Sequence, residues 1–248
     1  MKEWLEKIGL MKSNYKNELI PAAAGVLFII IGVLGWLLFI SIDLGKARIN
    51  SHLIFVSVII GSAGLLDDMV GDKNSQGFKG HFYQLFAGKL TTGTLKALIS
   101  FITIVFIVWS QNVNIVTGII HLSLILLMTN FINLLDLRPG RAIKFFILFS
   151  LLLITMLPFI WIYFLPIFGL IIPYTYYELK GKVMLGDTGA NVLGVILGYC
   201  FTLWPSLIGK LILLVSLLIL TMISEKYSFT EYIAKVKFLN WLDRLGRN

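Results

Sequence analysis

The chain has 248 residues, of which 58% are hydrophobic and 14% are charged, and its mean hydropathy is +0.88. A soluble domain carries roughly 25% charged residues, so this composition excludes an ordinary soluble core and requires a bilayer. The net charge of +8 is better explained by the basic cytoplasmic loops of a membrane protein than by a nucleic-acid partner. We therefore expect an all-α, polytopic membrane bundle formed by a single domain over residues 1–248.

Eight apolar segments along the chain predict transmembrane helices, which need about 20 mainly apolar residues each. Before them, the first twenty residues are charged, which argues against a cleavable signal peptide. Residues 1–12, and residues 229–245 after the last segment, have the pattern of amphipathic helices at a lipid interface. The predicted spans are 21–40, 51–66, 91–109, 114–134, 142–160, 161–179, 187–204 and 207–223.

The distribution of charge predicts the orientation of these spans. If the N-terminus is cytoplasmic, all but three of the 21 Lys and Arg residues lie on the cytoplasmic side or at that end of a span. The exceptions are Lys46, Arg48 and Lys210. Because cytoplasmic loops carry the excess of Lys and Arg, both termini are expected in the cytoplasm. All but one of the 13 acidic residues then share that side, the exception being Asp43.

The cysteine and histidine contents exclude two kinds of site. The single cysteine, Cys200, lies in an apolar segment, so no internal disulfide can form. The three histidines, His52, His81 and His121, are too far apart in sequence to indicate a His-rich metal cluster. Candidate chemistry is therefore expected from carboxylates, amides and basic side chains.

The first group of such side chains closes the second predicted span, where the sequence GLLDDMVGD occupies residues 64–72. Each carboxylate at bilayer depth costs on the order of 3 kcal/mol, and adjacent like charges add repulsion. The carboxylates could simply begin a solvated loop. For Asp72 this explanation is as good as a functional one. Because Asp67 and Asp68 directly follow apolar residues, we favour a site where a magnesium ion or another cation offsets the cost.

The fourth span ends in a polar stripe, NFINLLD, at residues 130–136. Spacings of three place Asn130, Asn133 and Asp136 along one drifting helical face. Such side chains either join helices, at about 0.6–2 kcal/mol for each hydrogen bond, or line a binding site, and both explanations stay open. The basic turn LRPGR at 137–141 follows, and it either holds a phosphate or reflects charge topology alone.

The seventh span begins with LGDTGAN at residues 185–191. An Asp at a helix start is often only an N-cap. Glycines there also allow close backbone approach, and a helix N-terminus can bind a diphosphate. With Asp187 present, such a diphosphate would need a cation between it and the carboxylate. All three groups lie on one face of the membrane in the expected orientation, which favours a shared site.

In this order, the three motifs resemble those of the polyprenyl-phosphate N-acetylhexosamine-1-phosphate transferase superfamily. Residues 14–21 and the tails at 225–228 and 243–247 are also similar, so the resemblance covers about residues 12–247. It implies transfer of a sugar-1-phosphate from a UDP-sugar to polyprenyl (undecaprenyl) phosphate, with release of UMP. The implied place is the cytoplasmic face of a bacterial inner membrane, where such transfer supports cell-envelope glycan synthesis.

The resemblance also implies roles for particular residues. Asp67, Asp68 and Asp136 would be catalytic, with the aspartate pair facing the lipid phosphate. Asp187, together with Asn133, would hold Mg²⁺, with Mn²⁺ as the alternative ion. The residues expected to bind the nucleotide and the phosphates are Asn130, Asn133, Lys89, Lys96, Arg138 and Arg141.

Elementary chemistry refines the roles of the aspartate pair. Attack occurs at phosphorus, so no glycosidase-type pair of carboxylates is needed. The second pKa of a phosphate monoester is near 6, so the lipid phosphate is largely ionised at pH 7 and a general base contributes little. We therefore interpret Asp67 and Asp68 as positioning groups, whereas the cation and nearby Lys or Arg side chains stabilise the leaving UMP.

Departures from the family pattern leave other functions open. Family members usually have about ten spans and a His-rich cytoplasmic loop, and Asp136 is followed here by Leu137 instead of Gly. The identity of the sugar and the nucleotide, and a homodimeric state, therefore stay open. One alternative is a non-catalytic protein that binds polyprenyl phosphate or regulates its use. Another is a transporter, although transporter sites lie near the bilayer midplane.

Overall fold

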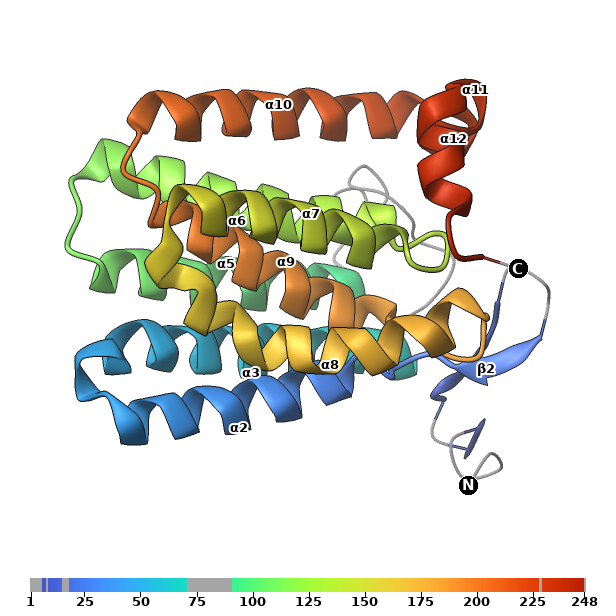
Figure 1. The fold of residues 1–248 in the computed structure, drawn as a ribbon, viewed down its shortest axis with the longest axis horizontal. Helices are drawn as coiled ribbons and strands as arrows, with labels where there is room; N and C mark the ends of the chain where they lie inside the picture. Colours follow the sequence, from blue (N-terminus) through green and yellow to red (C-terminus); the bar gives the residue numbers. More distant parts are fainter. Residues whose placement is uncertain (1–5, 8, 15–17, 71–90, 228, 248) are drawn as a thin grey trace.

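The computed structural model describes residues 6–7, 9–14, 18–70, 91–227 and 229–247. Two strands form a hairpin and the rest of the described chain is mainly helical, which confirms the all-α class (Figure 1). The strands are β1 (Met11–Ser13) and β2 (Leu19–Pro21), and two 3₁₀ turns are η1 (Leu44–Lys46) and η2 (Pro158–Ile160). The α-helices are α2 (Val26–Ile42), α3 (Ala47–Val70), α5 (Thr92–Ser110), α6 (Ile115–Leu135), α7 (Arg141–Met156), α8 (Trp161–Leu179), α9 (Gly186–Thr202), α10 (Leu207–Lys226), α11 (Phe229–Lys235) and α12 (Lys237–Arg244).

Five helical segments of the described chain are long and apolar enough to cross a membrane. They are Leu44–Val70, Thr92–Ser110, Ile115–Leu135, Pro158–Leu179 and Leu207–Ser224. The apolar helix α2 has 17 residues, α7 has 16 and α9 has 17, so each is about 24–26 Å long at 1.5 Å per residue. The five segments fit a membrane protein, whereas the predicted total of about eight spans is not confirmed.

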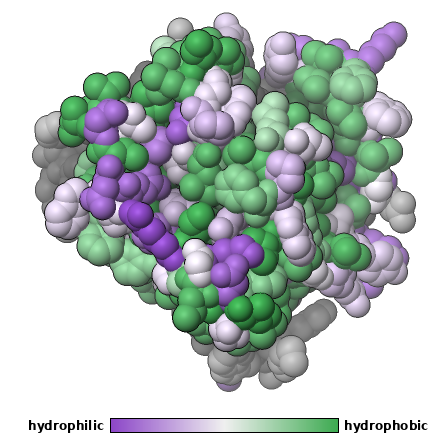
Figure 2. Space-filling view, turned by 60° about the vertical axis from the view of Figure 1, so that its left-hand side comes forward, coloured by the Kyte–Doolittle hydropathy of each residue, from purple (hydrophilic) through white to green (hydrophobic). Residues whose placement is uncertain are grey.

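The outward faces of the bundle are apolar, as a lipid environment requires. Leu34 on α2, Phe106 on α5 and Ile212 on α10 are all more than half exposed, a state that a soluble protein avoids for large contiguous surfaces. Figure 2 shows hydrophobic residues over most of the visible face, with hydrophilic residues gathered in smaller patches between them.

Helix α9 is the centre of the bundle and packs mainly against α3 and α6 (Figure 1). Every residue from 188 to 202 is buried. Two glycines, Gly194 and Gly198, face α6 so closely that an added Cβ would lie 2.5 Å from the Cα of Thr129 and 2.9 Å from the Cα of Ile125. This spacing of small residues lets two apolar helices approach at backbone distance, where dispersion holds them together.

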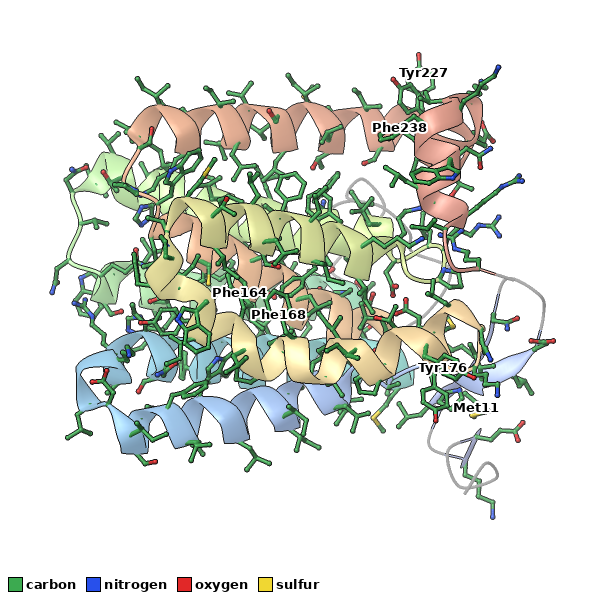
Figure 3. All side chains as sticks on the ribbon, viewed as in Figure 1. Met11, Phe164, Phe168, Tyr176, Tyr227 and Phe238 are labelled. Carbon is green, nitrogen blue, oxygen red and sulfur yellow. The ribbon has the colours of Figure 1, made fainter. Side chains whose placement is uncertain are left out.

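Aromatic rings join α7 to α8. The ring of Phe146 on α7 lies 5.8 Å from that of Phe164 and 6.3 Å from that of Phe168, which come from successive turns of α8 (Figure 3). Such edge-on pairs contribute about 0.5–1.5 kcal/mol beyond the area they bury. Helix α2 also contacts α8, because the indole nitrogen of Trp36 on α2 donates to the carbonyl oxygen of Tyr163 at 2.9 Å.

The structure of the C-terminal segment was predicted better than that of the N-terminal segment. The amphipathic helix expected over residues 1–12 is wrong for residues 11 and 12, because β1 pairs antiparallel with β2, Met11 opposite Pro21. The C-terminal prediction is confirmed as two short helices, α11 and α12. The ring of Phe238 on α12 (Figure 3) stacks on that of Trp241, and both side chains are exposed, as expected at an interface.

The hairpin and α11–α12 lie at one end of the bundle (Figure 1). This end also holds the last turn of α3 and the first turn of α9, with their aspartates Asp67, Asp68 and Asp187. We call it the carboxylate end. The opposite end holds the α2–α3 turn and the α5–α6 turn, together with His52 and His121. We call it the histidine end.

Candidate functional site

The carboxylate of Asp68 caps helix α9 from the end of α3. It accepts hydrogen bonds from the backbone N–H of Asp187 at 3.1 Å, and from the backbone N–H and hydroxyl of Thr188 at 2.9 and 2.7 Å. The ammonium of Lys12 on β1 donates to the same carboxylate at 3.2 Å, and Asp68 is only 3% exposed. Because the first N–H groups of a helix have no partner within it, an anion at this point satisfies them and complements the helix dipole.

A second aspartate of α3 points to a different partner. The ammonium of Lys96 on α5 lies 2.8 Å from Oδ2 of Asp67 and 2.6 Å from Oδ2 of Asp187. The two carboxylates also lie within hydrogen-bond reach of each other. Three helices, α3, α5 and α9, therefore bring two carboxylates of separate sequence motifs around one cation. All three side chains are less than a third exposed, so the attraction is only partly screened by water.

The backbone around Gly186 makes this approach possible. Gly186 has a φ of +67°, which favours glycine, and an added Cβ would lie 2.1 Å from the carbonyl oxygen of Ala22. On α3, a Cβ at Gly64 would lie 2.7 Å from the carbonyl oxygen of Asp187. The segment after β2, the end of α3 and the start of α9 therefore meet at backbone distance.

Asp136, directly after α6, faces further carboxylates. The backbone N–H of Gly186 donates to it, but burial raises the pKa of Asp136 well above that of an ordinary aspartate, and the negative charges of Glu178 and Asp187 raise it further. Glu178 itself is 1% exposed, and its Oε1 accepts from the backbone N–H of Gly140 at 2.9 Å. Among the described residues, Oε2 of Glu178 has no hydrogen-bond partner. This end of the protein therefore buries two further carboxyl groups beside the three that Lys12 and Lys96 contact.

A groove leads away from Lys96 between α5, α6 and α10. It has a volume of about 560 Å³. One part is polar and includes Lys96, Asn130, Asn133 and Asn191, and the amide nitrogen of Asn130 is buried without a described partner. The apolar part is lined by side chains that include Phe101, Leu126, Leu127, Leu214 and Leu218. The groove is therefore amphipathic, with a polar part at Lys96 and an apolar part between the helices.

The structure brings together most of the residues that the sequence singled out. Asp67, Asp68, Asp187 and Lys96 form one cluster, and Asn130 and Asn133 share the groove with Lys96. No hydrogen bond in the described chain joins Asn133 to Asp187, the two residues predicted to share a metal ion. Two predicted residues, Lys89 and Asp72, lie outside the described residues.

The two arginines of the basic turn have different surroundings. Arg138 lines a small cavity of about 40 Å³ next to Asp136 and Glu178, so it stays a candidate for phosphate binding. Arg141 instead donates from Nε and Nη2 to the two carboxylate oxygens of Asp243 on α12, at 2.8 and 3.1 Å. This bidentate pair is 7% and 12% exposed, so Arg141 holds the C-terminal helix in place and is not directed at the groove.

Three residues of this end were not predicted individually. Glu178 is a lone carboxylate within the aromatic end of a predicted span, YTYYELK, and that isolation is the signal by which it could have been found. Asn191 lay within a motif already identified, but its place in the groove depends on packing. Lys12 reaches Asp68 only because β1 pairs with β2, and the sequence has no local signal for that contact.

The side chains present fit a magnesium ion. Within the described ranges, no group of three or more His, Cys, Asp or Glu side chains is arranged to hold a metal. Mg²⁺, however, commonly uses one or two carboxylates and completes its shell with water and substrate phosphates. Asp67 and Asp187 offer two oxygen ligands that already converge on one cation, the ammonium of Lys96.

Comparisons with protein-family models, with curated proteins and with solved structures found no match to this chain.

Proposed function

We propose that the protein is a sugar-1-phosphate transferase that acts on polyprenyl (undecaprenyl) phosphate and a UDP-sugar, with N-acetylhexosamine-1-phosphate as the transferred group. The observation that carries the proposal is the convergence of Asp67 and Asp187 on one cation, Lys96, at the polar end of an amphipathic groove. The resemblance of the three sequence motifs supports the same conclusion, because two of them contribute these carboxylates.

The groove supports the choice of acceptor. A polyprenyl phosphate has one phosphate and a long hydrocarbon chain. Lys96 would neutralise the phosphate, and the amides of Asn130 and Asn133 would donate hydrogen bonds to its oxygens. Phe101, Leu214 and the other apolar side chains would enclose the first isoprene units, each buried CH₂ contributing about 0.8 kcal/mol.

The proposed reaction makes limited demands on the protein. A phosphate oxygen of the lipid attacks the phosphorus that carries the sugar, a new P–O bond forms, and the bond to the UMP oxygen breaks, so that UMP leaves with the electron pair. Asp67 and Asp187 would hold Mg²⁺, which when bound supplies charge neutralisation for the diphosphate. Asp68 fixes the start of α9, and with it Asp187, because positioning accounts for much of the rate of phosphoryl transfer.

The proposed location is a bacterial cytoplasmic membrane with the carboxylate end in the cytoplasm, where UDP-sugars are made. This topology counts α2, α7 and α9 as short spans beside the five longer ones, giving eight. Contacts between the helices agree with alternating directions. The start of α3 meets the end of α9 through His52 and Tyr199, and the end of α3 meets the start of α9 through Asp68 and Thr188.

The experiment is an assay of the purified protein with undecaprenyl phosphate, Mg²⁺ and a panel of nucleotide sugars, measuring release of nucleoside monophosphate. We expect release with one UDP-sugar, loss of release in EDTA, and recovery on adding Mg²⁺. Asp43→Asn, at the histidine end, is the control that should keep full activity. Saturable binding of undecaprenyl phosphate with no release from any sugar would instead favour the non-catalytic, lipid-binding alternative.

A further inference from the structure

A chain of hydrogen bonds links buried polar side chains at the histidine end, far from the carboxylates. The ammonium of Lys210 donates to Nε2 of His121 at 2.8 Å, so Nδ1 of this ring carries the proton and donates to Oε1 of Gln111 at 2.6 Å. The amide of Gln111 then donates to the hydroxyl of Thr202 at 3.4 Å, and that hydroxyl donates to the carbonyl oxygen of Tyr199. The chain of hydrogen bonds therefore begins at a buried cation, the ammonium of Lys210.

A second chain of contacts lies beside the first. The hydroxyl of Ser110 donates to the carbonyl oxygen of Ile107 at 2.7 Å and so accepts from Nε2 of His52, which lies 3.1 Å away. Nδ1 of His52 is then the acceptor for the hydroxyl of Tyr199 at 2.8 Å. The guanidinium of Arg48 donates to the carbonyl oxygen of Ser110. The two chains of hydrogen bonds therefore bring two histidines and two cations together at the histidine end.

Negative charge is lacking at this end. Lys210 is 7% exposed, and in the described part of the chain no carboxylate pairs with it or with Arg48. Among the described acidic residues, Asp43 alone lies at this end, and it pairs with Lys46 at 2.9 Å. A buried ammonium without a counter-charge is costly even when it is hydrogen-bonded. The arrangement is therefore incomplete unless an anion joins it.

The space for such an anion is present. A cavity of about 310 Å³ lies between the starts of α3 and α6 and the end of α9, within the size range of small-ligand sites. Lys210 stands directly behind His121 and is in contact with its ring nitrogen. The polar side chains that line the cavity are Arg48, His52, Gln111, His121, Tyr199 and Thr202.

We propose that this cavity binds a phosphate anion, either as free inorganic phosphate or as the phosphate-monoester headgroup of a lipid. Arg48 offers planar guanidinium donors that match phosphate oxygens, and the amide of Gln111 and the ring of His121 are within the same wall. Lys210 supplies charge from behind that wall. The site is separate from the proposed transferase site, because it is built at the opposite ends of α3, α6 and α9.

The experiment uses the full chain in phosphatidylcholine nanodiscs. One arm measures equilibrium binding of radiolabelled inorganic phosphate. The other measures how strongly spin-labelled phosphatidic acid is immobilised, relative to spin-labelled phosphatidylcholine. The variants are Lys210→Met, which keeps the apolar stem of the side chain, and Arg48→Gln. Lys46→Met is the matched control, since Lys46 lies at the same end but outside the cavity.

We expect saturable binding in at least one arm, weakened about tenfold or more by Lys210→Met and by Arg48→Gln and unchanged by Lys46→Met. Binding in the first arm alone identifies free phosphate, and binding in the second alone identifies a lipid headgroup. If Lys210→Met does not fold, Arg48→Gln tests the proposal instead, because the side chain of Arg48 is exposed and its replacement should leave the fold intact. The proposal is overturned if neither probe binds, or if the folded cavity variants bind as the wild type does.

Discussion

Two adjacent aspartates of α3 have different partners because consecutive residues of a helix point about 100° apart. Asp68 is turned toward the first turn of α9 and Asp67 toward Lys96 on α5. From the sequence alone the two are indistinguishable carboxylates at the end of a span. The structure separates a capping carboxylate from one that is available to a cation, so their substitutions should have different effects.

For Asp68→Asn we predict a loss of stability. The amide can still accept a hydrogen bond, but it loses the charge that faces Lys12 and the dipole of α9. Hydrogen bonds to a charged group contribute about 1.5–3 kcal/mol, so the midpoint of thermal unfolding in detergent should fall clearly. Asp67→Asn serves as the comparison and should unfold close to the wild-type temperature. Wild-type stability in Asp68→Asn would show that the cap is dispensable.

For Asp67→Asn we predict a loss of turnover with the fold retained. Removing one ligand or positioning group at a phosphoryl-transfer site costs on the order of 10²-fold or more in rate. Raising the pH from 7 to 9 should not rescue this variant, because the lipid phosphate is already largely ionised at both values. The measurement is a pH–rate profile at saturating Mg²⁺. Recovery to a near wild-type rate at high pH would identify Asp67 as a general base, contrary to the positioning role.

At the scale of elements, hydropathy alone predicted a helix at each of eight places, and the structure has one there. The lengths of these helices were harder to predict, because α7 and α9 end at turns whose positions depend on contacts with neighbouring helices. The hairpin was missed because residues 1–12 have a polar–apolar pattern that also suits a helix. What decided the outcome was the pairing of β1 with β2 and contacts such as that from Met184 N–H to the carbonyl oxygen of Pro21, which no local pattern encodes.

The candidate site could be predicted from the sequence where its functional groups belong to short motifs. Acidic motifs at the ends of apolar segments identified Asp67, Asp68 and Asp187, because charge next to a membrane span is costly and therefore informative. The partner of Arg141 could not be predicted, for the opposite reason. A basic residue after a span is expected from charge topology, and only the docking of α12 shows that it pairs with Asp243.

The junction between β2, α3 and α9 gives a prediction about glycine. Gly186→Ala should destabilise the protein by about 1–3 kcal/mol, because the residue has a positive φ and its new Cβ would meet the carbonyl oxygen of Ala22. The control is Gly169→Ala on α8, where no atom lies within 4 Å of the added Cβ and the helix should gain up to about 1 kcal/mol. Thermal unfolding of both variants tests this; equal midpoints would contradict it.

The attachment of α12 gives a prediction about pH. Burial opposes ionisation of Asp243, but hydrogen bonds from Arg141 and Arg247 outweigh it and lower its pKa to about 2, below about 3.9 in an unfolded chain. The clamp should therefore be fully present above pH 4 and be lost as the pH falls through 2. A spin label at Phe238→Cys, with Cys200→Ser, should be immobile down to pH 4 and mobile near pH 2.

In that series, Asp243→Asn should free the label already at pH 7, whereas a label at Ile212→Cys on α10 should not respond to either change. Unchanged mobility of the α12 label in Asp243→Asn would show that apolar contacts, not the ion pair, hold the helix.

At the scale of the whole molecule, the two ends of the bundle differ in the kind of polar group they bury. The carboxylate end gathers buried or half-buried acids around Lys12 and Lys96, and the histidine end has cations around a cavity. Antiparallel neighbours produce this separation, because α3, α6 and α9 each have a polar group at both ends and an apolar middle. A bilayer around that middle leaves both polar ends at water interfaces.

The last prediction concerns which end faces the cytoplasm. Basic residues in cytoplasmic loops set orientation, and among the described basic residues only Lys46, Arg48 and Lys210 lie at the histidine end. In whole bacterial cells, a membrane-impermeant maleimide should therefore label Lys46→Cys but not Arg244→Cys, and permeabilised cells should show labelling of both. The wild type is the background control, since its one cysteine, Cys200, is fully buried. Labelling of Arg244→Cys in intact cells would show that the bundle has the opposite orientation in the membrane. It would also place the carboxylate end away from the cytoplasmic UDP-sugars, which would remove the basis for the proposed transferase activity.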